Sequence, residues 1–284
     1  FESSFFARFL FALRDRQRIS IGLSKGLISI TNREIDLTKP SSWEFSGLSQ
    51  NGEDGIILEL IKSLNLNNKN KWCCEFGAWD GIHGSNTFNL VKNYKYNAVY
   101  IEGDKDKFED LLITKKKNPK IIAFNDYISH KNKSLLLDNV LKKTKIPKNF
   151  DVLSIDIDSY DLAVWKSLKH YRPKIVIIEI DSGIAPGIKQ VYSKKKDGNS
   201  FTSTVEYAKK NGYVLVSHTG NCIFLKKKYV KKINYDKKYI KYPELLFDKS
   251  WLENKENLLK KFIISILPNK ILKILRRIKK LLTI

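Results

Sequence analysis

The sequence predicts an α/β fold whose seven-stranded, mostly parallel sheet is completed by an antiparallel hairpin. From about residue 49, short apolar runs alternate with amphipathic segments, which is typical of consecutive βαβ units. The first five runs end in polar or acidic residues, as expected for buried parallel strands that open into a site at their carboxyl ends. The last two runs lie only four residues apart, a spacing that suits a hairpin.

The predicted elements follow one another in a regular order. A helical stripe at residues 56–64 precedes the first strand, and a second helix is expected to begin near Ser85. The predicted strands span residues 72–77, 98–102, 120–124, 151–156, 175–180, 213–217 and 222–225. Most of the segments between them have helical periodicity.

Composition divides the chain into three parts. Residues 1–45 form an aromatic-rich accessory segment, residues 46–228 the α/β domain, and residues 229–284 a basic extension. The end of that extension, residues 270–284, has an apolar helical stripe with Lys and Arg around the rest of the helix. This helix can either dock on the domain or lie on an anionic membrane surface.

The net charge is +22, from 52 Lys and Arg against 30 Asp and Glu. Such an excess attracts polyanions, although a solvated lysine-rich surface explains it equally well. Nucleic acid is disfavoured because no nucleic-acid-binding module is recognisable. The cysteines, Cys73, Cys74 and Cys222, form no paired spacings, so we expect buried thiols in a cytoplasmic protein. There is no CxxC spacing, so we assign no metal ligands among the cysteines.

The turn after the first predicted strand is the sharpest local signal, with Glu75, Gly77, Asp80 and Gly81 in close succession. Glycines let a backbone turn tightly beside a ligand, and a carboxylate can bind a cationic amino group. The bulky Trp79 and the acidic Asp80 argue against a diphosphate ligand at this turn. An ordinary strand-to-helix turn remains the alternative.

Two further strand ends suggest a nucleoside site. Glu102 closes the second strand, where a carboxylate can accept both ribose hydroxyls. Asn125 and Asp126 follow the third strand and could reach the adenine edge, or could belong to an exposed loop.

The fourth strand ends in the acidic run that contains Asp156 and Asp158, and the fifth ends in Glu179-Ile-Asp181. Carboxylates at adjacent strand ends repel one another, which suggests a functional site. Asp156 and Asp158 would share one side of the strand if it extended through both. They could bind a metal, orient a sugar hydroxyl or remove its proton. His83 and His218 lie on loops and are either bases or structural histidines.

Four ordered motifs within residues 49–226 together resemble the FkbM-type methyltransferases. They are Ser49-Gln50-Asn51-Gly52-Glu53-Asp54, Glu75-Phe-Gly77-Ala-Trp-Asp80-Gly81, Tyr100-Ile-Glu102-Gly-Asp104 and Leu153-Ser-Ile-Asp156-Ile-Asp158-Ser-Tyr160-Asp161. The resemblance implies a Rossmann-like class I methyltransferase fold with S-adenosylmethionine as cofactor.

The resemblance also assigns roles to individual residues. It implies that the methionine part of the cofactor lies against Glu75, Gly77 and Gly81, and the ribose against Glu102. Asp156 would form the floor near the transferred methyl group. Gln50 and Asp54 would belong to a preceding segment that closes over the pocket.

Taken together, the residues and the resemblance predict O-methylation of a hydroxyl on a glycan, a lipid-linked acceptor or another small metabolite. Asp156, and Asp158 or His218, would stand near the acceptor as catalytic groups. Two alternatives remain. Asp156 and Asp158 also have the form of the acidic pair of a metal-dependent glycosyltransferase, and a non-catalytic basic module could bind lipid or nucleic acid.

Overall fold

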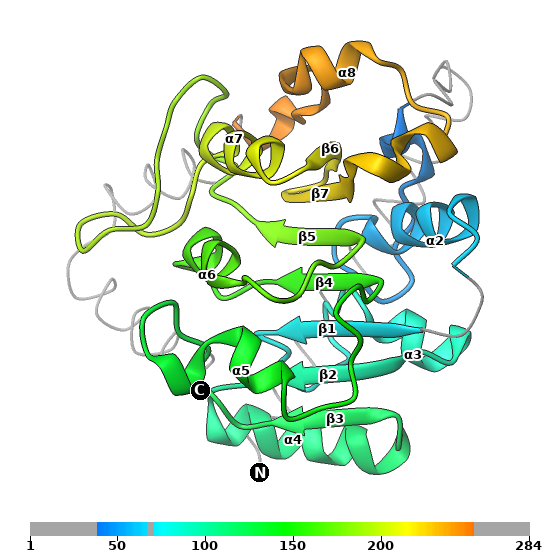
Figure 1. The fold of residues 1–284 in the computed structure, drawn as a ribbon, viewed down its shortest axis with the longest axis vertical. Coiled ribbons are helices and arrows are strands. Elements are labelled where there is room, and N and C mark those ends of the chain that lie inside the picture. The colour runs from blue at the N-terminus through cyan, green and yellow to red at the C-terminus, as the bar shows by residue number, and fades with distance from the viewer. Residues whose placement is uncertain (1–38, 67–70, 253–284) are drawn as a thin grey trace, which may run out of the picture. The chain divides into compact units, whose positions relative to one another are not determined.

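The computed structural model describes residues 39–66 and 71–252, in which seven strands form one sheet. The strands are β1 (Trp72–Phe76), β2 (Asn97–Ile101), β3 (Ile121–Phe124), β4 (Val152–Ile155), β5 (Ile175–Glu179), β6 (Tyr213–His218) and β7 (Asn221–Lys226). Their order is β3-β2-β1-β4-β5-β7-β6, with β7 antiparallel to both neighbours and the other pairs parallel (Figure 1). The structure therefore confirms the predicted Rossmann-like class I methyltransferase fold and its final hairpin.

Helices cover both faces of this sheet. The α-helices are α2 (Glu53–Ser63), α3 (Phe88–Tyr94), α4 (Lys105–Lys117), α5 (Leu137–Leu141), α6 (Asp161–Ser167), α7 (Phe201–Lys210) and α8 (Lys238–Lys241). The 3-10 helices are η1 (Pro40–Trp43), η2 (Lys133–Leu135), η3 (Lys227–Lys232), η4 (Pro243–Leu246) and η5 (Lys249–Trp251). Within the described ranges, no helix combines the length and the apolar character that crossing a bilayer requires.

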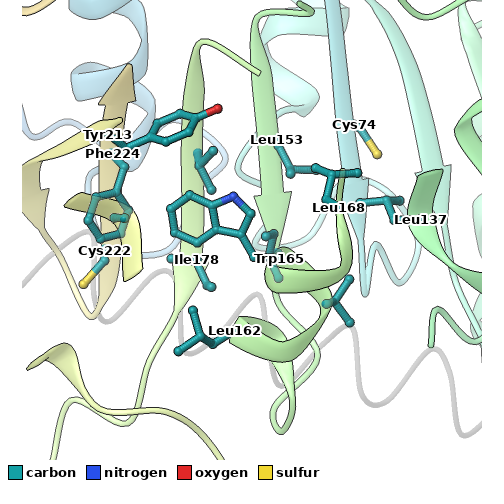
Figure 2. Close-up of a cluster of buried hydrophobic side chains, with 14 of the residues drawn as sticks. Cys74, Leu137, Leu153, Leu162, Trp165, Leu168, Ile178, Tyr213, Cys222 and Phe224 are labelled. Atoms are coloured by element: carbon teal, nitrogen blue, oxygen red, sulfur yellow. The ribbon is translucent and has the colours of Figure 1, made fainter. Parts of the chain in front are cut away.

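The alternation of side chains along the strands divides the core into two layers. Cys73 and Cys74 are both fully buried, but they belong to different hydrophobic clusters on opposite faces of the sheet, as their adjacency in a strand predicts. Figure 2 shows the cluster of Cys74, which is centred on Trp165 of α6. The Trp165 ring packs against Tyr213 and Phe224, with centroids 5.5 and 5.3 Å away. All three thiols of the chain are free and buried.

The segment after β7 covers the outer strand of the sheet. Tyr239, Leu246 and Phe247 are buried and join the same cluster as Trp165. The Tyr235 hydroxyl donates a hydrogen bond to the β6 backbone at the carbonyl of Leu215, 2.5 Å away. The predicted helix over residues 270–284 and most of the predicted segment 1–45 lie outside the described residues. The predicted domain boundaries at residues 45 and 228 stay predictions.

Candidate active site

A cavity of about 520 Å³ opens at the carboxyl ends of β1, β2 and β4, the edge of the sheet toward which these strands point in Figure 1. This volume lies within the usual range for a cofactor or ligand pocket. Several predicted site residues line it: Gln50, Glu75, Gly77, Glu102, Asp126, Asp156 and Asp158. Among the described residues, its lining contains six carboxylates against a single lysine, Lys107, in a chain whose overall charge is strongly positive.

The turn after β1 and the carboxylate at the end of β2 lie side by side. The amide of Trp79 donates to Glu102 Oε2 at 2.7 Å, and the amide of Asp104 donates to Glu102 Oε1 at 2.9 Å. A carboxylate offers about four lone-pair positions, so Glu102 can still accept two ribose hydroxyls. Gly77 has φ of +73°, and a Cβ there would lie 1.7 Å from the carbonyl oxygen of Asp156. Only glycine therefore lets β1 turn this close to the end of β4.

Glu75 shapes one wall of the cavity. Its buried carboxylate accepts hydrogen bonds from the Ser85 hydroxyl at 2.7 Å, the Asn86 amide at 3.0 Å and the Thr87 hydroxyl at 2.5 Å. Burial raises the pKa of Glu75 despite these bonds. Because Ser85 to Thr87 are held in this way, α3 begins at Phe88 and not near Ser85.

Gln50, in the segment before α2, and Asp54, in the first turn of α2, have different roles. Asp54 does not line the cavity: one carboxylate oxygen accepts the amides of Gly47, Leu48 and Ser49 at 2.9, 2.6 and 2.8 Å. Gln50 does line it, and a Cβ on Gly84 would lie 2.5 Å from its Nε2. Asp54 thus holds the loop that carries Gln50 to the cavity.

Asp80 and Gly81 lie behind the cavity lining. Asp80 accepts the amides of Ile82 and His83, and its Oδ2 lies 2.5 Å from Nδ1 of His83, which does line the cavity. Burial raises the pKa of Asp80, but the bonds from His83 and Ile82 outweigh it, so the pKa is lowered. Gly81 is a packing position, because a Cβ there would lie 2.8 Å from Leu111.

The two polar residues predicted after β3, Asn125 and Asp126, lie in different environments. The Asn125 amide group donates to the carbonyls of Glu102 and Gly103 at 2.8 and 3.2 Å, which ties the ends of β2 and β3 together, and it does not line the cavity. Asp126 lines the cavity next to the exposed Tyr127.

Three carboxylates meet where β4 and β5 end. Oxygens of Asp156, Asp158 and Glu179 all lie within 4.8 Å of one another. Strand alternation does not cause this, because β4 ends at Ile155 and Asp158 adopts a left-handed φ of +61°. The amide of Asp158 donates to Glu179 Oε2 at 2.9 Å. The turn, and not a continued strand, brings the pair together.

Two members of this acidic cluster (Asp156, Asp158 and Glu179) hold their protons more tightly than isolated carboxyls do. Burial and the charge on Asp158 together raise the pKa of Asp156 to about 6. Burial and the charge on Asp156 raise the pKa of Glu179 in the same direction. Mutual repulsion is relieved either by a shared proton or by a divalent cation, for which the three oxygens could serve as ligands.

His218 lies away from the cavity lining and is almost fully buried. Its Nδ1 accepts the amide of Asp248 at 3.0 Å, and its Nε2 lies 2.9 Å from the Ser182 hydroxyl. That hydroxyl donates to the carbonyl of Gly220, so Nε2 must be the protonated nitrogen of a neutral ring. Burial lowers the pKa of His218 to about 4. The ring also stacks on Phe247, with centroids 4.5 Å apart.

Among the lining residues to which the sequence analysis gave no role are Lys107, Tyr127 and Tyr160. Tyr127 directly follows Asp126, and Tyr160 stands inside the acidic run after β4, so their positions next to strand ends were the available signal. Lys107 lies in the first turn of α4, with Nζ 5.7 Å from the centre of the Trp79 ring.

No known family model matches this sequence, and no curated protein matches it. Among solved structures, the chain is similar to TrmK of M. capricolum in complex with S-adenosylhomocysteine, at 18% identity and a TM-score of 0.38 over 78% of this chain and 94% of TrmK. It is similar to the N-terminal domain of EvdMO1, at 9% identity and a TM-score of 0.39 over 61% and 80% of the two chains. It is also similar to a SAM-dependent methyltransferase of Aquifex aeolicus, at 12% identity and a TM-score of 0.35 over 60% and 87%.

Proposed function

We propose that this chain is an S-adenosylmethionine-dependent methyltransferase that O-methylates a hydroxyl of a glycan, a lipid-linked acceptor or a small metabolite. The observation that carries this proposal is the acidic cavity in which Glu102 and the Gly77 turn lie side by side. Its carboxylates suit a ligand with a sulfonium and an ammonium group, whereas they would repel a diphosphate.

The residues present fit this cofactor, which supplies a methyl group on a sulfonium when bound. Glu102 would accept the ribose hydroxyls, and the Gly77 turn would lie against the methionine part. Asp126 would reach the adenine edge, and Gln50 would approach from the segment before α2. Asp54, Asp80, Gly81 and Asn125 would act through the loops they hold, because they do not line the cavity.

The acidic cluster offers the proton acceptor that an O-methylation requires. Asp156 lines the cavity and has a pKa raised to about 6, close to the pH at which a general base works best. Asp158 and Glu179 lie within reach of Asp156 and can take part in holding its proton. We assign His218 no contact with the acceptor, because both of its ring nitrogens bind other parts of the chain.

Isothermal titration tests the proposal directly. We expect micromolar binding of S-adenosylmethionine and no binding of UDP-glucose. Purified protein that is denatured and analysed by mass spectrometry should also release adenosylmethionine or adenosylhomocysteine. Binding of neither cofactor form, with lipid or nucleic acid bound instead, would favour the basic binding module.

A metal-dependent glycosyltransferase is the second candidate, because three carboxylates with oxygens within 4.8 Å could hold a divalent cation. It predicts the reverse titration result: UDP-glucose binds in the presence of Mn²⁺, and S-adenosylmethionine does not. In that case Asp158→Asn would weaken the binding of Mn²⁺ itself, which calorimetry measures without any reaction.

We also propose that the basic C-terminal part holds the enzyme at an anionic membrane surface in the cytoplasm. The described portion of this part presents exposed lysines next to exposed apolar side chains: Lys227, Lys228, Lys231, Lys232, Lys238, Lys241, Tyr242 and Leu245. Lysines with interleaved aromatic and aliphatic groups suit an anionic bilayer. The buried free thiols suit the reducing cytoplasm.

Vesicle sedimentation tests the membrane proposal. The full chain should sediment with phosphatidylserine-containing vesicles and not with pure phosphatidylcholine vesicles. Deletion of residues 270–284 should weaken that association while leaving the cofactor affinity intact. If sedimentation were unchanged after the deletion, the helix predicted over residues 270–284 would not contribute to membrane binding.

A further inference from the structure

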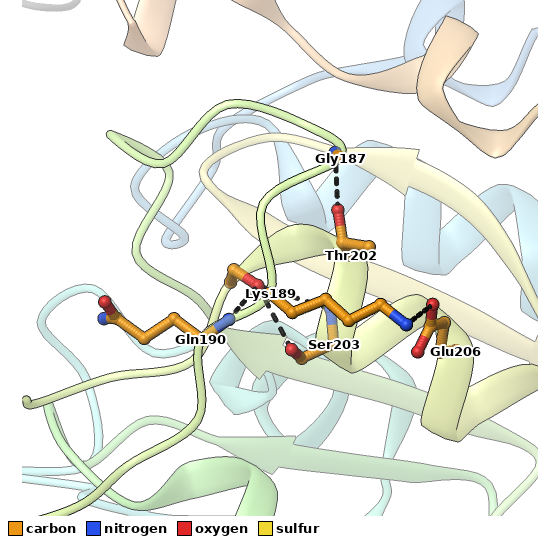
Figure 3. A network of polar contacts seen from close by, with 7 residues as sticks. Gly187, Lys189, Gln190, Thr202, Ser203 and Glu206 are labelled. Atoms are coloured by element: carbon orange, nitrogen blue, oxygen red, sulfur yellow. Dashed lines mark hydrogen bonds and ion pairs between the residues drawn. The ribbon is translucent and has the colours of Figure 1, made fainter.

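The connection between β5 and α7, residues 180–200, is long and contains no helix or strand of its own. Connections of this length in compact domains are uncommon and usually functional. This one is fixed at its base, as Figure 3 shows: the Gly187 amide donates to the Thr202 hydroxyl at 2.8 Å, and Lys189 pairs with Glu206 at 2.6 Å. The Gln190 amide donates to the Ser200 hydroxyl at 3.0 Å. These contacts give the connection a defined conformation beside the carboxyl edge of the sheet.

An aromatic cluster forms where this connection meets the rest of that edge. It consists of His130 from the segment after β3, Tyr160 from the turn after β4, and Tyr192 from the connection. The ring centroids of His130 and Tyr160 lie 5.2 Å apart, those of Tyr160 and Tyr192 5.5 Å, and those of His130 and Tyr192 6.2 Å. All three residues are partly exposed, so the cluster presents ring surface to solvent.

The aromatic cluster adjoins the acidic part of the cavity. Tyr160 lines the same cavity as Asp156, Asp158 and Glu179. Its hydroxyl donates to the carbonyl of Ile128 at 2.9 Å, which fixes the ring. The Gly198 amide donates to the carbonyl of Ser159 at 2.9 Å, so the connection is anchored to the turn that carries these groups. Ring surface and hydrogen-bond acceptors thus stand next to each other.

The cluster also contains an unused polar atom. Nδ1 of His130 is buried and has no hydrogen-bond partner among the described residues. A buried polar atom without a partner costs free energy, so the chain itself leaves this part of the cluster incompletely satisfied.

We propose that the aromatic cluster binds the pyranose ring of a sugar acceptor, an inference that rests on the proposed methyltransferase function. A pyranose has apolar C–H faces that pack on aromatic rings, and hydroxyls that donate to carboxylates. The acidic lining disfavours a phosphorylated or carboxylated acceptor, since like charges repel. A purely apolar acceptor would leave the cavity carboxylates without hydrogen-bond partners.

Saturation-transfer NMR on the full chain tests this inference. The probes are methyl glycosides of glucose, mannose, galactose and rhamnose, together with catechol as a non-sugar hydroxyl compound, all in the presence of S-adenosylhomocysteine. At least one glycoside should receive saturation at its ring C–H protons. Tyr192→Ala should weaken this binding about five- to tenfold, whereas Tyr192→Phe should keep it.

Tyr94→Ala is the matched control, because it removes an exposed tyrosine of α3 that does not line the cavity. It should leave the glycoside signal unchanged, and all variants should bind S-adenosylmethionine as the wild type does. Saturation of catechol alone, of no probe, or of a glycoside equally in Tyr192→Ala would overturn the inference. Failure of the wild type to bind S-adenosylmethionine would instead overturn the proposed function.

Discussion

The carboxyl ends of β4 and β6 lie at the same edge of the sheet and carry titratable side chains, yet they behave differently. At the end of β4, Asp156 faces a cavity among other carboxylates, and its pKa is raised to about 6. At the end of β6, His218 is enclosed by Phe201 and Phe247, and both of its ring nitrogens have partners. A polar residue at a strand end is thus a candidate for chemistry only where the surrounding chain leaves it incompletely satisfied.

Gly77→Ala should have the largest effect of the proposed substitutions. It acts at the carboxyl end of β4, where Asp156 faces the cavity. The new Cβ would lie 1.7 Å from the Asp156 carbonyl oxygen, so β1 and β4 must separate. We expect a thermal midpoint at least about 8 °C lower and no detectable binding of S-adenosylmethionine, since each kcal/mol corresponds to about 2–4 °C in a chain of this size. Differential scanning calorimetry and titration measure the two effects.

Gly212→Ala is the control for this substitution. Its φ of +79° is similar, but no atom lies within 4 Å of the added Cβ. Only the left-handed penalty of about 1 kcal/mol remains. Equal losses in the two variants would mean that the contact between the Gly77 turn and Asp156 is not what fixes this site.

Glu102→Ala should have the second-largest effect, a loss of about 3 kcal/mol in the free energy of cofactor binding. The substitution removes the carboxylate, so two charge-assisted hydrogen bonds to ribose are lost. The Trp79 and Asp104 amides also lose their acceptor. Titration should show an affinity about 100-fold lower. Glu206→Ala is the control: it removes a partly exposed glutamate of α7 that does not line the cavity, and it should bind the cofactor normally. If Glu102→Ala kept the wild-type affinity, Glu102 would not contact the nucleoside.

His218→Gln tests the carboxyl end of β6, where His218 is enclosed, through the pH dependence of the free energy of unfolding. The folded-state pKa of about 4 lies below the usual value of 6.5. The unfolded chain therefore takes up a proton first as the pH falls, and wild-type stability is lost from about pH 6.5 down through pH 4. Between pH 7.5 and pH 5, the wild type should lose about 2 kcal/mol more unfolding free energy than His218→Gln.

Urea unfolding at the two pH values measures this difference. His170→Gln, which alters an exposed histidine, should keep the wild-type slope. If His218→Gln also keeps that slope, then His218 is not held neutral, and the contrast between the two strand ends disappears.

Lys189→Ala should have the smallest effect. In the Lys189–Glu206 pair at 2.6 Å, the two side chains are 63% and 45% exposed, so water and salt screen the pair. We expect a loss of at most about 0.5 kcal/mol in urea unfolding. A loss above about 1.5 kcal/mol would mean that the connection after β5 is fixed more by this pair than by its backbone hydrogen bonds.

The sheet was predictable because its strands are buried on both faces and appear as separate apolar runs. β4 was expected at residues 151–156 and spans Val152–Ile155, and β7 was expected at 222–225 and spans Asn221–Lys226. Positions at strand ends were predictable for the same reason, so Gly77, Glu102 and Asp156 all line the cavity.

The remainder of the site depends on contacts that spacing does not reveal. Asp158 reaches the acidic cluster through a left-handed turn, which strand periodicity cannot show. The aromatic cluster joins Tyr192 to His130, which are far apart in sequence. The Thr219 hydroxyl donates to Glu53 at 2.8 Å across 166 positions, and this contact helps to fix the segment that carries Gln50. Such side-chain hydrogen bonds depend on the fold that brings distant parts of the chain together.

The place of β7 between β5 and β6 bears on how the protein is made. The ribosome delivers β1 to β5 first, and the outer edge of β5 has no partner until residue 226 has left the exit tunnel. An unpaired edge of this kind pairs readily with other chains. A nascent chain that stalls or is cut before Asn221 should therefore aggregate or recruit chaperones, even though the groups around the cavity have already been synthesised.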